Sequence, residues 1–224
     1  MKEGDVVVVD YVGRIKESGE LFDTTKKEVA EEEDAVNERT EYKPIKIVVG
    51  AGMIVEGLDE ALEDMEIGDS KEVEISPEMA FGKRKGNLIK TVSEKKFKDE
   101  EVNPYPGMRV TLDNRVGRVL SVNSGRVRVD LNHPLAGKTL HYKVEAKEMV
   151  TDEEEKVEAI VENYLGEDVE VEFEDKNAVV EIPKPLNKNI QEEVGGTIKE
   201  YTKMEDVEFK ESGENEGEDK EAEQ

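Results

Sequence analysis

The chain has 224 residues, of which 35% are hydrophobic and 40% are charged, and its net charge is −25. It contains no cysteine, which excludes disulfides, a thiolate nucleophile and a Cys-ligated metal site. No stretch approaches the apolar length of a membrane span, so we expect a cytoplasmic protein without membrane association. The apolar residues fall in periodic runs, which favours small folded units with charged surfaces over disorder.

The first 50 residues have the pattern of strands around a polar segment. Residues 5–15 are rich in β-branched side chains and 21–25 follow a short polar turn, so the two predict a hairpin. Residues 26–43 are polar and charged, which predicts a long surface loop with a short helix around Val29–Val36. Residues 42–50 predict another strand, which ends at glycines.

A helix is predicted over residues 53–69. Apolar side chains recur there at three- and four-residue spacing while acidic residues fill the other face, and Gly68 ends the pattern. Residues 70–76 then alternate between apolar and polar side chains, as in a strand with one buried face.

Residues 83–131 form a basic island in an acidic chain. They hold twelve lysines and arginines against six acidic residues, which suggests a domain or a partner of their own. Short strands are predicted at 108–112, 116–122 and 126–131, separated by the turn-forming Asp-Asn and Asn-Ser-Gly sequences. The segment therefore predicts a small β-rich unit.

Residues 139–149 alternate again, so Tyr142 is predicted to face inward and His141 outward. His133 precedes a proline, which favours extended backbone at the surface. The two histidines lack the spacing of a helical metal pair, and we expect neither a metal site nor a cofactor. There is also no Walker, GxSxG, HExxH or CxxC motif, which leaves hydrolase and phosphotransferase functions without support.

Residues 151–210 predict a separate small α+β domain. A capping box from Thr151 to Glu154 starts an amphipathic helix over 151–166, and two short strands then form a hairpin. Residues 185–203 predict a second helix, which is weakened at Gly195 and Gly196 because glycine has a low helix propensity. One more strand is predicted after it. The acidic tail, 211–224, is predicted to be unstructured.

Six blocks of the sequence occur in the order of the landmarks of one family. The blocks VDYVGRI, LFDTT, IKIVVG, MIVEGLDEALEDM, ISPEMAFG and LHYKVE resemble those of FKBP-type peptidyl-prolyl isomerases, over residues 1–82 and 132–150. The interruption after AFG and the re-entry at NHPLAGKTLHYKVE resemble the SlyD-like branch with an insert-in-flap domain. The long 26–43 loop and the C-terminal domain resemble the long archaeal type.

This resemblance implies an α+β fold in which a bent antiparallel sheet wraps one short helix. The domains would be 1–82 with 132–150 for the isomerase, 83–131 for a chaperone insert, and 151–210 at the C-terminus. It also implies a shallow apolar pocket that binds proline. Its residues would be Tyr11, Phe22, Asp23, Ile45, Ile54, Val55, Leu58, Phe81 and Tyr142.

The resemblance also implies roles. Asp23, held by Tyr11, would face the carbonyl of the residue before proline, and the Val55 backbone N–H would anchor the peptide. Leu58 stands where many family members have Trp, and Phe81 where many have Tyr. Without the family blocks, the aromatic residues would be ordinary core and Asp23 a turn former.

The basic insert has three interpretations: an incidental charged β unit, a surface that binds unfolded polypeptide, or a nucleic-acid module. The second is favoured by the resemblance, and its client-binding residues would be Ile89, Val92, Phe97 and Tyr105. Charge supports the third, but no stacking platform or nucleic-acid motif accompanies it. Residues 151–210 would form a homodimer interface or a second client surface. The alternatives for the whole chain are a non-catalytic chaperone, a nucleic-acid-binding module that uses the basic insert, and a purely structural scaffold.

Overall fold

The computed structural model describes residues 1–38, 40–166 and 169–211. From residue 212, the predicted acidic tail lies outside the described residues. The chain divides into two compact units, which we describe separately. One holds residues 1–14, 19–73 and the chain from 141 onward, and the other holds 15–18 and 74–140. No helix in the described ranges is long and apolar enough to cross a membrane.

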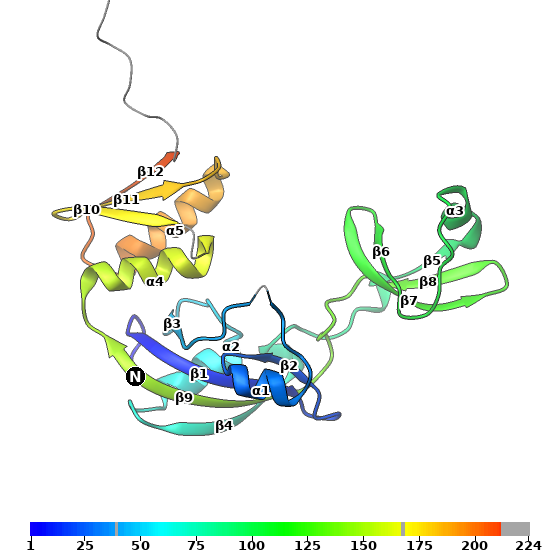
Figure 1. Ribbon diagram of the computed structural model, residues 1–224, viewed down its shortest axis with the longest axis horizontal. Coiled ribbons are helices and arrows are strands. Elements are labelled where there is room, and N and C mark those ends of the chain that lie inside the picture. Colours follow the sequence, from blue (N-terminus) through cyan, green and yellow to red (C-terminus); the bar gives the residue numbers. More distant parts are fainter. Residues whose placement is uncertain (39, 167–168, 212–224) are drawn as a thin grey trace, which may run out of the picture. The chain divides into compact units, whose positions relative to one another are not determined.

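A five-stranded sheet organises the N-terminal part of the chain (Figure 1). Its order is β2-β1-β9-β4, and β3 pairs with the first half of β1 while β2 pairs with the second half, both antiparallel. Its strands are β1 (Val6–Ile15), β2 (Leu21–Thr24), β3 (Ile45–Val48), β4 (Ser70–Ile75) and β9 (Leu140–Val150). The sheet thus joins the start of the chain to the segment that follows residue 139.

Two helices accompany this sheet. α1 (Lys27–Glu32) lies in the predicted loop, slightly before the expected helical segment. α2 (Glu56–Glu63) buries Leu58 and Leu62 but is shorter than the predicted 53–69 helix. Val55 keeps an extended backbone and caps α2, so the residues before it belong to the loop that follows β3.

The second unit contains an antiparallel sheet of four strands in the order β5-β8-β7-β6. Its elements are β5 (Ile89–Ser93), α3 (Glu94–Asp99), β6 (Arg109–Leu112), β7 (Arg115–Asn123) and β8 (Arg126–Asp130), with short 3₁₀ turns at Pro77–Met79 and Gly86–Leu88. The core is small, with Val119, Val127 and Val129 fully buried. The three predicted strands are confirmed, whereas β5 and α3 were not predicted.

Both predicted turns of this unit are confirmed by backbone geometry. Asp113 and Asn114 have φ of 52° and 58°, and Ser124 and Gly125 have φ of 48° and 72°. Two consecutive residues with positive φ match the right-handed twist of the flanking strands, and Asn, Asp and Gly adopt that conformation at little cost. These turns connect β6 to β7 and β7 to β8.

The C-terminal elements form a three-stranded sheet with two helices. They are α4 (Glu153–Leu165), β10 (Glu170–Glu174), β11 (Asn177–Ile182), α5 (Lys188–Tyr201) and β12 (Asp206–Glu211). β10 and β11 form the predicted hairpin, and β12 runs parallel to β11 because α5 provides the crossover. The helix α5 continues through Gly195 and Gly196 without interruption.

The start of α4 corrects one prediction. Asp152, not Thr151, is the N-cap, and its carboxylate accepts hydrogen bonds from the N–H groups of Glu154 and Glu155 at 3.1 and 3.0 Å. Aspartate caps as well as a hydroxyl residue does, and its negative charge is also favourable at a helix N-terminus.

The C-terminal elements share a hydrophobic core with the first sheet. Val6, Val48 and Val150 of that sheet belong to the same buried cluster as Ile160 of α4 and Ile198 of α5. Polar contacts border this core: Glu162 of α4 pairs with Lys43 at 2.9 Å, and the Asn163 amide donates to the Lys46 carbonyl at 2.5 Å. Part of the apolar surface of the C-terminal elements is therefore covered by the chain itself.

Candidate functional site

Three aromatic rings meet on the first sheet, each from a different strand. Tyr142 of β9 contacts Tyr11 of β1 at a centroid distance of 5.8 Å and an interplanar angle of 63°. It also contacts Phe22 of β2 at 5.6 Å and 86°. Both contacts are edge-to-face, the arrangement that the aromatic quadrupole favours. We call Tyr11, Phe22 and Tyr142 the ring cluster; the structure brings together these three residues of the predicted pocket.

Alternation along the strands explains how the ring cluster forms. On β9, Leu140, Tyr142 and Val144 are buried while Lys143 is exposed, so the predicted inward direction of Tyr142 is confirmed. On β2 the register shifts: Gly13 pairs with Asp23 and Arg14 with Leu21, which leaves Phe22 as the extra residue of a bulge. A bulge changes the direction in which a side chain points. In this bulge, the Phe22 ring points toward Tyr142 and contacts it.

Gly13 provides the space that the rings occupy. A Cβ atom at this position would lie 2.7 Å from Phe22 Cζ and 3.1 Å from Tyr142 Cε1. The Gly13 backbone is not in the left-handed region, so the requirement for glycine is one of space and not of backbone conformation. The sequence analysis missed this residue, although the block VDYVGRI contains it.

Asp23 lies beside the ring cluster and is held by one of its members. The Tyr11 hydroxyl donates a hydrogen bond to Asp23 Oδ2 at 2.8 Å. Burial, followed by the negative charge of Asp23, raises the pKa of the Tyr11 hydroxyl, which therefore remains a donor. The same two causes raise the pKa of Tyr142. The predicted contact between Tyr11 and Asp23 is confirmed.

Behind the ring cluster, a buried polar chain fixes β1 against the end of β2. The Tyr11 N–H donates to Thr25 Oγ1 at 2.9 Å, and that hydroxyl donates to Asp10 Oδ1 at 2.7 Å. Asp10 also pairs with Lys147 at 2.7 Å. Burial acts to raise the pKa of Asp10, but the hydrogen bonds from Lys147 and Thr25 and the nearby positive charges outweigh it and lower that pKa.

The remaining pocket residues of the first unit lie around the start of α2 and on β3. Leu58 is buried, whereas Ile45, Ile54 and Val55 are half-buried. The loop before α2 is held by Asp59, whose carboxylate accepts from the N–H groups of Gly50 at 2.8 Å and Gly52 at 3.2 Å. Asp59 was not predicted, because an acidic residue on a helix appears in sequence as part of the solvated face.

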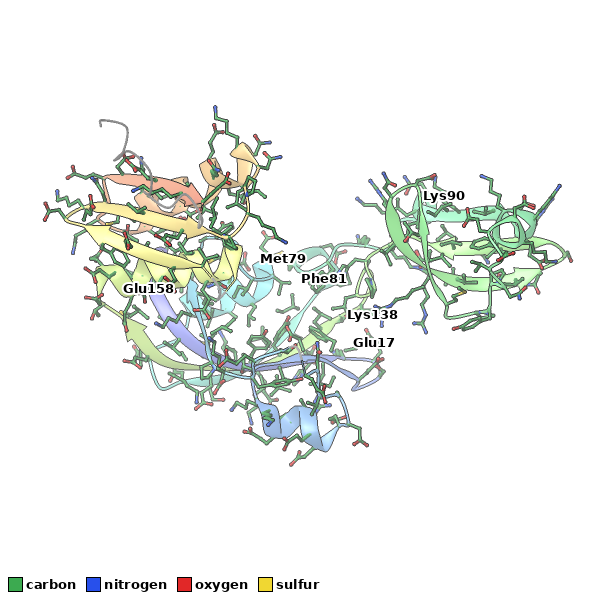
Figure 2. The ribbon with its side chains drawn as sticks, turned by 45° about the horizontal axis from the view of Figure 1, so that its top comes forward. Glu17, Met79, Phe81, Lys90, Lys138 and Glu158 are labelled. Atoms are coloured by element: carbon green, nitrogen blue, oxygen red, sulfur yellow. The ribbon has the colours of Figure 1, made fainter. Side chains whose placement is uncertain are left out.

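Phe81 belongs to the second unit, where it stacks on His133. The two rings are 4.2 Å apart and nearly parallel, at 7°. They lie on the two segments that enter and leave the inserted sheet, and the Gly137 N–H donates to the Gly82 carbonyl between these segments at 2.8 Å. Figure 2 labels Phe81 on the entering segment and Lys138 on the returning one. The predicted surface position of His133 is confirmed, but its contact with Phe81 was not predicted.

The same two segments are cross-linked by polar side chains nearer to the inserted sheet. Arg84 donates two hydrogen bonds to Asp130 Oδ2, at 2.8 Å from Nε and 2.5 Å from Nη2. Asn132 pairs with the backbone of Lys85 through both amide atoms, at 2.8 and 3.0 Å. Each connection of the inserted sheet is therefore braced against the other.

The predicted client-binding residues of the insert differ in exposure. Tyr105 is 62% exposed, whereas Phe97 packs against the core of the inserted sheet. Val92 pairs with the buried Val127, and Ile89 is half-buried at the start of β5. Of these four residues, Tyr105 thus presents the largest accessible apolar side chain.

Neither histidine lies in a group of metal-ligating side chains. The described residues contain no cluster of three or more His, Asp or Glu side chains that would hold a metal ion. His141 Nε2 lies 3.6 Å from a carboxylate oxygen of Glu72, and His133 Nδ1 accepts a weak hydrogen bond from the Leu135 N–H at 3.3 Å.

Comparisons with known proteins identify the family. The short-type peptidyl-prolyl cis-trans isomerase of Methanocaldococcus jannaschii is 35% identical over 155 residues, which cover 69% of this chain and 98% of that protein. The FKBP-type isomerase SlyD of Aeromonas hydrophila is 34% identical over 146 residues, 64% of this chain and 62% of that protein. A family profile described as "FKBP26, IF domain" matches residues 90–135.

The chain therefore belongs to the FKBP-type peptidyl-prolyl cis-trans isomerases, as the sequence blocks predicted. The profile match falls on the inserted sheet and on the segment that returns from it, including Asn132 and His133.

Proposed function

We propose that the chain isomerises X–Pro bonds of unfolded or partly folded polypeptides at the ring cluster, without a covalent intermediate. The observation that carries this proposal is the geometry of Tyr11, Phe22 and Tyr142 around a carboxylate that Tyr11 orients. The membership of the chain in a family of peptidyl-prolyl isomerases agrees with it.

Such a site suits the reaction because no bond has to be made or broken. Rotation about the amide has a barrier of about 18–20 kcal/mol, set by resonance. For X–Pro bonds the two ground states differ by only about 0.5–1 kcal/mol, so an enzyme needs only to lower the barrier. The twisted amide is less conjugated and less dipolar than the planar one, and an apolar pocket that excludes water favours it.

We assign the following roles within this site. Asp23 faces the carbonyl of the residue before proline, and Tyr11 holds Asp23 in position. The Val55 N–H, just before the first turn of α2, anchors the backbone of the peptide. The proline ring contacts Phe22, Ile54, Val55, Leu58, Phe81 and Tyr142, and Ile45 completes the apolar wall.

Because Phe81 stacks on His133, replacing His133 by alanine is expected to lower kcat/KM for an X–Pro peptide. The parallel contact restricts the Phe81 ring, and aromatic pairs of this kind contribute about 0.5–1.5 kcal/mol, or roughly two- to tenfold in rate. The matched control is His141→Ala on the polar side of β9, which should leave the rate unchanged. Equal kcat/KM values for the two variants would show that the contact of His133 with Phe81 does not contribute to activity.

We further propose that the inserted sheet binds unfolded polypeptide. Tyr105 and Val116, which are 62% and 68% exposed, supply apolar contacts on this unit. The excess of basic residues, including Arg126 and Arg128 on the exposed side of β8, supports attraction of acidic segments. The same charge supports nucleic-acid binding as the alternative, and retention on RNA or DNA at physiological salt would favour it.

Shortening the insert tests its role. The Leu131 N–H donates to the Leu88 carbonyl at 3.0 Å, so an Asn-Gly turn can replace residues 89–130 between these two neighbours. Isomerisation of a short peptide should remain within about twofold, whereas catalysed refolding of a proline-limited protein should slow about tenfold or more through lost local concentration of client. If both rates fall by the same factor, the insert has only a structural role.

The C-terminal α+β elements remain candidates for a homodimer interface or a second client surface. These elements share a hydrophobic core with the first sheet, which supports a third role: they pack against β1 and β3 and stabilise these strands. A cytoplasmic location likewise remains a prediction.

A further inference from the structure

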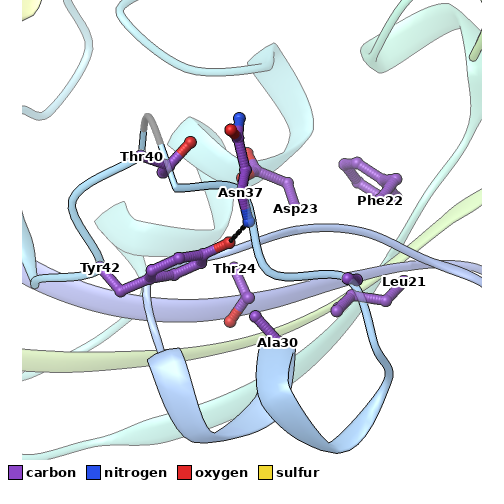
Figure 3. A pocket seen from close by; sticks show the side chains of 9 residues that line it. Leu21, Phe22, Asp23, Thr24, Ala30, Asn37, Thr40 and Tyr42 are labelled. Atoms are coloured by element: carbon purple, nitrogen blue, oxygen red, sulfur yellow. Dashed lines mark hydrogen bonds between the residues drawn. The ribbon is translucent and has the colours of Figure 1, made fainter.

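A cavity of about 270 Å³ lies beside β2 and is lined in part by Phe22 and Asp23 (Figure 3). Because Phe22 is a member of the ring cluster and Asp23 is bonded to another member, this cavity belongs to the proposed isomerase site. A second surface lies on the inserted sheet, whose strands are labelled in Figure 1. One side of that sheet holds its small core, against which Phe97 of α3 packs, and the other side is open.

The open side of the inserted sheet carries four arginines. On β8, Arg126 and Arg128 are exposed while the residues that follow each of them are buried. The register places two more arginines on the same side, since Arg118 of β7 pairs with Asp130 of β8, and Arg109 of β6 pairs with Arg118. All four are exposed. We call Arg109, Arg118, Arg126 and Arg128 the arginine face.

The arginine face lacks neighbouring carboxylates. Among the described residues, no member of the face has an ion pair, and Asp130 on the same side is already bonded to Arg84 and Asn132. Arg109 and Arg118 are direct cross-strand partners, and like charges placed opposite each other destabilise a sheet. A chain with 57 acidic residues keeps this unfavourable arrangement, which indicates that an anion from outside the chain neutralises it.

The choice of arginine indicates the kind of anion. The chain has 24 lysines and eight arginines, yet all four cationic residues of the face are arginine. The planar guanidinium group binds phosphate with two parallel hydrogen bonds, whereas a lysine would supply charge alone. Hydroxyl groups accompany the arginines: Thr91 and Ser121 pair with Arg128 from either side, and Ser93 pairs with Arg126. Hydroxyl groups are common donors to phosphate oxygens.

The rest of the face offers little to a base or to an apolar side chain. The four described strands of the inserted sheet contain no aromatic residue on which a nucleic-acid base could stack. An exposed apolar side chain is supplied by Val116, beside the turn that joins β6 to β7, so an unfolded polypeptide would bury little apolar surface there. The face therefore fits a chain of phosphates without bases.

We propose that the arginine face binds inorganic polyphosphate. The guanidinium groups contact successive phosphates of the polymer, and the neighbouring hydroxyl groups donate to the remaining oxygens. Because the contacts are to exposed charges, the affinity falls as the salt concentration rises. This binding goes beyond the proposed function and does not depend on it.

The test measures the dissociation constant of the full-length chain for a short linear polyphosphate, by isothermal titration calorimetry at several salt concentrations. Oligouridylate RNA and polyglutamate of equal charge are the comparison polymers. Polyphosphate should bind about tenfold more tightly than polyglutamate, whose charges lie on flexible side chains that must be ordered on binding. It should also bind more tightly than the RNA, whose bases have no partner on the face.

Two sets of variants locate the binding. Replacing Arg118, Arg126 and Arg128 by glutamine should weaken polyphosphate binding about 100-fold, and should reduce the slope of log affinity against log salt by about one for each arginine removed. The matched control replaces three exposed lysines of the same unit that lie off the face by glutamine. These are Lys90, Lys95 and Lys96. The control removes the same charge and should weaken binding by about threefold or less.

Thermal unfolding checks that the losses do not come from misfolding. Arg118→Gln alone removes a like-charge pair, so its Tm should equal or exceed that of the wild type. Polyphosphate should raise the Tm of the wild-type chain and not that of the triple arginine variant. Equal losses of affinity in the arginine and lysine variants would overturn the proposal, as would polyglutamate or RNA that binds as tightly as polyphosphate.

Discussion

Replacing Gly13 by alanine is expected to lower kcat/KM for an X–Pro peptide by about tenfold or more, with the fold retained. The new Cβ would lie 2.7 Å from Phe22 Cζ, closer than carbon atoms approach without displacement. Phe22 is half-buried and stands at the end of a strand, so its ring can move outward without disrupting the sheet. The movement breaks its edge-to-face contact with Tyr142, and the pocket that we propose for proline loses one wall.

The matched control for this variant is Gly196→Ala. Gly196 lies on the exposed side of α5, and a Cβ there has no neighbour within 4 Å. Alanine favours a helix over glycine by about 1 kcal/mol, so this variant should be slightly more stable and equally active. A Gly13→Ala chain as active as wild type would mean that the position of Phe22 does not matter for the rate. Circular dichroism and thermal unfolding of both variants check that each of them folds.

Replacing Asp23 by alanine is expected to lower kcat/KM by about tenfold or more, the loss that follows removal of one charged hydrogen-bonding group from a site. Asp23 is exposed, and its carboxylate accepts a hydrogen bond from the Tyr11 hydroxyl at the edge of the sheet, so the fold should tolerate the change. Glu172→Ala, at an exposed position of β10 in the same unit, controls for the loss of one negative charge.

A double-mutant cycle separates the two roles in this pair. If Tyr11 acts by holding Asp23, then Tyr11→Phe lowers the rate in the wild-type background but adds little to Asp23→Ala. Equal effects of Tyr11→Phe in both backgrounds would show that its hydroxyl acts on the substrate independently of Asp23. The raised pKa of Tyr11 keeps its hydroxyl protonated near neutral pH, so ionisation of Tyr11 does not contribute to the result.

Features that depend on neighbours in sequence could be predicted. The alternation on β9 places Tyr142 inside and His141 on the polar side, because successive side chains of a strand point to opposite faces. The Asp-Asn and Ser-Gly turns of the inserted sheet follow from the backbone conformations that these residues accept. One prediction at short range was nevertheless wrong. Thr151 and Asp152 are both good N-cap residues, and Asp152, not Thr151, caps α4.

Features that depend on contacts between distant segments could not be predicted. The stack of Phe81 on His133 joins residues 52 positions apart in the chain, and neither block of sequence indicates the other ring. Asp59 satisfies the N–H groups of Gly50 and Gly52, a role that its place on an acidic helix face conceals. β5 and α3 were not predicted because their apolar residues do not recur at regular spacing. Regular spacing is not required there, since the inserted sheet buries only a small core.

The central claim is that the ring cluster and Asp23 lower the barrier to rotation about an X–Pro bond. The most direct measurement is the cis–trans exchange rate of one Ala-Pro peptide, by NMR, with wild-type chain, Gly13→Ala and Asp23→Ala at equal concentration. The account predicts strong acceleration by the wild-type chain and about a tenfold loss or more in each variant. Exchange that is equally fast with all three proteins, or as slow with the wild type as without protein, would contradict it.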